Sequence, residues 1–257
     1  MAFVVGMLIK TAAVPIVVAV VVTWLLHRLE RLKPHAATLG VACGFIAGWF
    51  FQEFSVWFPV RYLDWFPAAA LILALLPRVS PIAAAWLLVP AFPKMVPPRL
   101  WAVGLLTVST YGLAWFLNKA TDKIQQRVIV GVFMATGTAC SLVLLQSFSL
   151  KFAQIAGLLT ASLTAALLSA NKPYGNAKGL PFLFIGLMCN LMFIGYANTS
   201  SDVPTWCFAL PLVAPLVLLW NPGSKKLQAV RYALVVTILM VAVIPALLVH
   251  PPWEAEH

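Results

Sequence analysis

About ten apolar segments, each close to a membrane thickness in length, follow one another from residue 3 to residue 249. A membrane-spanning helix needs about 20 consecutive apolar residues. Hydrophobic residues make up 62% of the chain and charged residues 9%, and the mean hydropathy is +0.95. A soluble chain of 257 residues with this composition would lack the polar side chains to coat its surface. The sequence therefore predicts an integral membrane protein.

The fold class predicted is all-α: a polytopic transmembrane helical bundle of about ten helices. Lipid permits only helices or a closed barrel, because backbone groups must be satisfied internally, and these long runs do not alternate as barrel strands do. No stretch is long enough for a separate soluble domain, so residues 1–257 are expected to form a single integral membrane domain. The helices are expected at about 3–26, 36–58, 62–76, 80–97, 99–118, 127–147, 150–170, 180–198, 203–220 and 228–249.

The region 67–92 is ambiguous, because its two strongly apolar runs are only ten and eleven residues long. Between them lies a short Pro77–Pro81 linker that contains Arg78. Two short tilted spans, a re-entrant hairpin, or a single helix through both runs would each fit this pattern.

The net charge of +10 comes from basic residues that lie singly or in threes beside apolar segments. That pattern sets topology and contacts anionic lipid headgroups, and it does not indicate nucleic-acid binding. The expected location is the plasma (cytoplasmic or inner) membrane. An even number of crossings in 62–97 places twelve basic residues on the inner face and four on the outer face, with both termini outside. The four are Arg61, Lys94, Arg99 and Lys151.

Two stretches, 32–40 and 150–157, are similar, and each opens the second helix of a possible five-helix half. The halves would be residues 1–118 and 127–250. Because five is an odd number, the two halves would be inverted in the membrane, as in many transporters. The sequence is thus compatible with a 5+5 inverted repeat.

Small residues recur at every fourth position on the second and seventh helices. Such a glycine-zipper stripe lets two helix backbones approach closely, and the simplest partner for one stripe is the other. We therefore predict that the two helices cross through Gly44 and Ala161, with a dimer interface as the alternative use of the stripe. The residues concerned are Gly40, Gly44, Gly48, Gly157, Ala161 and Ala165.

Lys10 and Glu53 are ionisable residues within apolar segments, where charge is costly to bury. At 1.5 Å per residue both lie roughly 7–11 Å below the outer boundary. They are interpreted as independent residues that extend to the interface, as a structural ion pair, or as a substrate or proton site.

Two further residues complete the candidate intramembrane polar site. Arg78 is either a loop residue or, at the tip of a re-entrant hairpin, an anion-binding group. Asn190 lies near the middle of its helix, where an amide needs a partner, and an interhelical hydrogen bond is the simplest expectation.

Catalytic and metal-binding patterns are missing from the sequence. No two carboxylates lie close enough on one helix to share Mg²⁺, and neither HExxH nor GxSxG is present. No pattern supports enzyme activity, although a membrane enzyme remains a third alternative, and no metal or cofactor is expected. The leading hypothesis is a small-solute transporter or permease; the alternative is a non-transporting scaffold or the anchoring subunit of a larger membrane complex. Expected partners are membrane lipids, a small solute, and a membrane protein or a second copy of the chain.

Overall fold

The computed structural model describes residues 12–30, 32–52, 62–75, 100–121, 123–147, 149–169, 179–198, 201–220 and 224–249. Within these ranges the regular structure is helical and no strand is present. The long helices are α2 (Val14–His27), α3 (Ala36–Phe51), α4 (Phe66–Leu75), α6 (Leu100–Ala120), α7 (Gln126–Gln146), α8 (Leu150–Leu168), α9 (Leu180–Asn198), α10 (Thr205–Val213) and α11 (Lys225–Val249). Short 3₁₀ helices are η2 (Lys33–His35), η3 (Tyr62–Trp65) and η5 (Ala214–Leu219).

Five of the described helices are long and apolar enough to cross a membrane. Three shorter apolar stretches, at α2, α4 and α10–η5, accompany them. The all-helical class is thus confirmed for the described residues, with five candidate membrane-spanning helices, whereas the number of about ten spans remains a prediction. The five are Lys33–Phe51, Gln126–Gln146, Leu150–Leu168, Leu180–Asn198 and Lys225–Val249.

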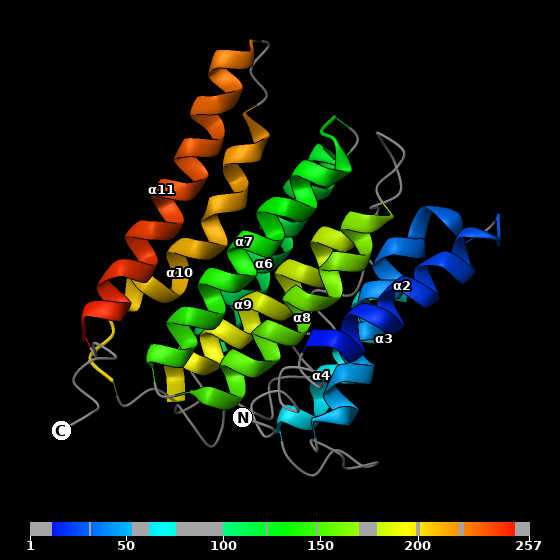
Figure 1. The fold of residues 1–257 in the computed structure, drawn as a ribbon. Helices are drawn as coiled ribbons and strands as arrows, with labels where there is room; N and C mark the ends of the chain where they lie inside the picture. Colours follow the sequence, from blue (N-terminus) through cyan, green and yellow to red (C-terminus); the bar gives the residue numbers. More distant parts are fainter. Residues whose placement is uncertain are drawn as a thin grey trace.

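Helix α9 lies at the centre of the described bundle (Figure 1). Its sequence is apolar on every side, and a helix of that kind is stable only when it is covered all round. In its apolar window 83% of the residues are buried inside the protein, against 28% for α11. Helices α4, α6, α7, α8 and α10 pack against α9. By contrast, α11 turns most of its apolar side chains outward, as expected for a lipid-facing helix.

Two antiparallel hairpins flank the α7–α8 pair (Figure 1). The α2–α3 hairpin packs on α8, and α10, η5 and α11 pack on α7. One buried apolar cluster runs from Ala37 of α3 to Ala246 of α11. Helices α3, α4 and α6 to α11 contribute to this core, whereas α2 packs on α3 and α8 without contributing a residue to it.

The predicted helix 203–220 is broken in the structure. It forms α10 and then η5, with Pro211 inside α10 and Pro215 in the first turn of η5. Proline has no N–H to donate and its ring clashes with the preceding turn, so a continuous α-helix is disfavoured here.

The glycine stripe of α3 packs on α2, so the predicted crossing of α3 and α8 through Gly44 and Ala161 is wrong. A methyl group on Gly44 would lie 2.5 Å from the carbonyl oxygen of Pro15 and 2.6 Å from Cβ of Ala19. A methyl group on Gly40 would overlap the hydroxyl of Thr23.

Helices α3 and α8 do contact each other, but the contact uses the last glycine of the stripe. A methyl group on Gly48 would lie 2.7 Å from Cδ2 of Leu158. On α8 the matching stripe is looser, since a methyl group at Gly157 would meet its nearest neighbour, Oγ of Ser141, at 4.0 Å. Ala161 is half-buried and Ala165 is buried.

In an inverted repeat, a contact between two helices has a counterpart between the two corresponding helices of the other half. One such counterpart is missing among the described helices. In the 5+5 arrangement α2 corresponds to α7 and α3 to α8. Helix α2 packs extensively on α8, yet the described part of the chain shows no comparable contact between α7 and α3. The inverted repeat therefore remains a prediction.

Helices α4 and α6 run in the same direction. The first residue of α4, Phe66, stacks on Trp49 near the end of α3, at 6.1 Å between ring centroids. At the other end of the bundle, Asn118 near the end of α6 accepts a hydrogen bond from the N–H of Gly179, which precedes α9. An even number of crossings between α3 and α6, which the charge count favours, requires this common direction.

Candidate functional site

Three of the four predicted polar-site residues, Lys10, Glu53 and Arg78, lie outside the described residues. The proposed pairing of Lys10 with Glu53, and the choice between two spans and a re-entrant hairpin at 67–92, therefore remain predictions. The fourth residue, Asn190, lies in the middle of α9 and is 1% exposed.

The side chain of Asn190 makes a hydrogen bond within its own helix. Its amide nitrogen donates to the carbonyl oxygen of Gly186 at 2.7 Å. The expected interhelical hydrogen bond is not made within the described part of the chain, and the side-chain oxygen Oδ1 is buried there without a partner. An unsatisfied polar atom in an apolar interior costs about 1–3 kcal/mol, so this oxygen marks the centre of the bundle as a site of interest.

Polar and sulfur-containing side chains surround this point of α9. Cys189 lies beside Thr110 of α6 and near Cys140 of α7. No hydrogen bond of ordinary geometry joins the Thr110 hydroxyl to a described residue, although the Cys189 thiol is adjacent to it. One helical turn before Cys140, the hydroxyl of Thr136 is also buried without a partner in the described ranges. We call Thr110, Thr136, Cys140, Cys189 and Asn190 the central polar cluster.

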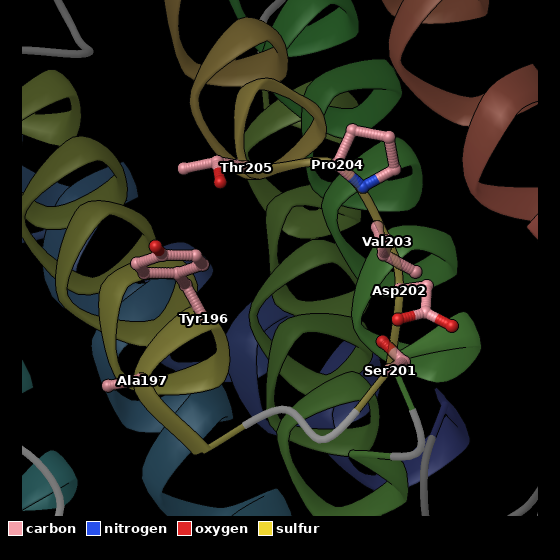
Figure 2. A pocket seen from close by; sticks show the side chains of 7 residues that line it. All are labelled: Tyr196, Ala197, Ser201, Asp202, Val203, Pro204 and Thr205. Carbon is pink, nitrogen blue, oxygen red and sulfur yellow. The ribbon is translucent and has the colours of Figure 1, made fainter.

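A pocket of about 590 Å³ lies where α9 ends and the chain continues into α10. Figure 2 shows Tyr196 and Thr205 on one side of the hollow and Ser201 and Asp202 on the other. The ring of Tyr196 forms a T-shaped pair with the ring of Phe208 of α10, at 5.6 Å between centroids. The pocket is open, and its lining residues are Tyr196, Ala197, Ser201, Asp202, Val203, Pro204 and Thr205.

One face of α9 connects the pocket to the central polar cluster. Tyr196 follows Cys189 by seven residues, which is almost two full turns, so the two side chains leave the helix in nearly the same direction. The axial distance between them is about 10 Å at 1.5 Å per residue. The pocket and the Cys189 part of the cluster are therefore two levels along one face of α9, whereas the Asn190 side chain leaves the helix about 100° away.

The end of the bundle where α2 and α6 finish and α7, α9 and α11 begin is strongly basic; we call it the basic end. Eight described lysines and arginines lie there, against Lys151 alone at the opposite end. Three of them lie over aromatic rings: Arg28 over Trp24 at 3.8 Å, Lys119 over Trp115 at 4.5 Å and Arg231 over Tyr232 at 5.0 Å.

Such cation–aromatic pairs are typical of a membrane–water interface, where aromatic rings and basic side chains both lie at the level of the headgroups. The positive-inside rule predicts that the basic end faces the cytoplasm and that the pocket, at the opposite end, faces outside; this orientation remains a prediction.

Sequence reasoning missed the pocket residues. Their signal was present as a polar stretch, residues 198–205, that ends in Pro204 before an apolar helix. Loops of this kind are common as plain connections, so composition alone did not distinguish a binding site from a turn.

No protein-family model matches the chain, and neither a curated protein nor a solved structure matches it. The class of the protein therefore rests on its helices. They are compatible with a multi-pass membrane protein, and they form a helical bundle with a central buried helix and a pocket at one end of it.

Proposed function

We propose that the protein is a small-solute transporter whose central helix is α9. The observation that carries this proposal is the buried, unpartnered side-chain oxygen of Asn190 at the middle of a helix enclosed by other helices. A solute, an ion or water that reaches this level in another conformation would satisfy that oxygen. Intramembrane polar groups that face a bundle interior commonly mark such pathways.

The pocket at the end of α9 supports the same function. Its volume of about 590 Å³ is within the usual range of sites for small molecules, roughly 300–1,000 Å³. Because Tyr196 and Cys189 lie on one face of α9, the pocket would serve as the mouth of a pathway that continues to the central polar cluster.

The break in the helix beside α9 supports the proposal, because it would let the two parts of that helix move relative to each other. Pro211 and Pro215 cannot donate the hydrogen bonds that a continuous helix would make to the carbonyl groups one turn earlier. Discontinuous helices next to a substrate site are a recurrent feature of transporters, since the break lets one half move and exposes backbone carbonyls to the solute. Helix α10 packs directly on α9.

A different observation favours the alternative, an anchoring subunit or scaffold. Between the central polar cluster and the basic end, the core is tightly packed by apolar groups. Phe133 stacks on Phe184 at 4.6 Å between centroids, and the side chain of Thr160 together with Cε of Met188 occupies the space above Gly137. A protein that never opens at this level would have no transport pathway.

Water access to Cys189 distinguishes the two functions without knowledge of the solute. The assay uses a variant that retains only Cys189, reconstituted in vesicles and exposed to a membrane-impermeant thiol reagent. In a transporter that opens intermittently, the Cys189 thiol is expected to be labelled slowly but completely, because it lies two turns below the pocket.

A second variant that retains only Cys43, which is half-buried on α3 and does not belong to the central polar cluster, serves as the control. Labelling of Cys189 no faster than that of Cys43, with both thiols reactive after denaturation, would refute the transport pathway and favour the scaffold.

A further inference from the structure

The chemistry of the pocket points to a particular class of ligand. Its lining offers the hydroxyl groups of Tyr196, Ser201 and Thr205 and the carboxylate of Asp202, and it contains no basic residue. In a chain with a net charge of +10, a pocket whose only charged group is acidic is a local exception. Its electrostatic potential therefore favours a cation over an anion.

The carboxylate of Asp202 is available to a ligand. Asp202 is exposed, and among the described residues no hydrogen bond or ion pair engages its side chain. The pocket also adjoins the C-terminal end of α9, where Tyr196 and Ala197 belong to the last helical turn. The carbonyl groups of a last turn lack helical partners and carry the negative end of the helix dipole, which adds to the attraction for a cation.

The ring of Tyr196 distinguishes an organic cation from a bare metal ion. Its T-shaped contact with Phe208 holds the ring at the rim of the pocket, and the residue remains 42% exposed. The face of an aromatic ring attracts ammonium groups, and the attraction is strongest for a weakly hydrated quaternary centre. A single carboxylate with hydroxyl groups would hold a divalent metal ion only poorly, since such ions need several carboxylate or carbonyl ligands.

We propose that the pocket binds a small organic ammonium ion, with its charge between the Asp202 carboxylate and the Tyr196 ring and with the hydroxyl groups of Ser201 and Thr205 beside it. This proposal rests on the proposed function, because it names the solute class that the same pathway would take. The binding step itself does not require transport.

Titration calorimetry of the full-length protein in an uncharged detergent tests the proposal, with choline as the probe. Its neutral isostere, 3,3-dimethylbutan-1-ol, has the same shape without the charge. Choline is expected to bind saturably and the isostere at least tenfold more weakly. Equal binding of the two, or no saturable heat with choline up to about 50 mM, would overturn the proposal.

Three variants locate the site. Asp202→Asn is expected to weaken choline binding at least fivefold, because it removes the charge and keeps the shape. Tyr196→Leu should weaken it about two- to fivefold, the contribution of an exposed cation–π contact. Glu30→Gln removes a carboxylate at the basic end and should leave binding unchanged. Unchanged affinity in Asp202→Asn protein that elutes as wild type would place the cation elsewhere.

Uptake of labelled choline into vesicles separates this inference from the proposed function. Binding that depends on Asp202 without uptake would support the pocket and refute transport of choline. Uptake that is insensitive to Asp202→Asn would support transport and refute the site.

Discussion

Replacing Gly44 by alanine tests the close approach of the α2 and α3 backbones. The added methyl group would lie 2.5 Å from the Pro15 carbonyl oxygen and 2.6 Å from Cβ of Ala19. Non-bonded atoms normally stay about 3.5–4.0 Å apart, so α2 and α3 must separate by about 1 Å. Neither obstructing atom is the end of a flexible side chain, so no rotamer change relieves the overlap.

Overpacking of this kind typically costs 1–3 kcal/mol. At about 2–4 °C per kcal/mol for a chain of this size, Gly44→Ala should lower the apparent melting temperature by about 2–12 °C. The measurement is a thermal melt of detergent-purified protein, followed by the loss of its monodisperse peak in size-exclusion chromatography.

Gly131→Ala is the matched control, because a methyl group on Gly131 of α7 would meet nothing within 4 Å. It should melt at or slightly above the wild-type temperature, since alanine favours a helix over glycine. Adding Ala19→Gly to Gly44→Ala should recover part of the loss by removing one of the two overlaps. If Gly44→Ala and Gly131→Ala melt alike, α2 does not approach α3 at Gly44 and the packing described above is incorrect.

Three further results are expected. Ser141→Ala should lower the stability by about 1 kcal/mol in the same melt, because it breaks the 2.8 Å hydrogen bond to the Ala153 carbonyl that joins α7 to α8. The control is Thr138→Ala, whose hydroxyl bonds within its own helix; it should change the stability by less than about 0.5 kcal/mol. Asn190→Leu should leave the melting temperature unchanged or raise it while slowing solute flux; a loss above about 2 kcal/mol would show that the amide is satisfied and structural. A reporter inserted within residues 121–126 should lie in the cytoplasm and one fused to the C-terminus outside, and the reverse result would refute the charge-based topology.

The positions of the helices follow closely from the sequence, because each depends on local apolar length. Helix α9 spans the predicted residues 180–198 without a shift, and α7 and α8 differ from prediction by only a residue or two. The break between α10 and η5 depended on how two prolines are accommodated, which composition does not settle, since prolines are often tolerated inside membrane helices.

The partner of the glycine stripe was not predictable in the same way. Small residues show that another backbone approaches, but they carry no information about which one. The structure places α2, the preceding helix in the chain, against Gly40 and Gly44, and α8 reaches the stripe only at Gly48. The pocket was missed for a related reason: it forms between the end of one helix and the loop that follows, so its lining residues have no shared spacing in the sequence.

The enclosure of α9 also limits how the protein can be made. During synthesis α9 leaves the ribosome after α8 and before α10, so on insertion it first meets lipid on the side that α10 later covers. Before α10 inserts, α9 can remain exposed to lipid on that side because its surface is apolar all round. The exception is Asn190, whose amide must face lipid or an earlier helix. Chains that stop after Asn198 should therefore insert but remain open along one side of α9, which would make them preferred targets of membrane quality control.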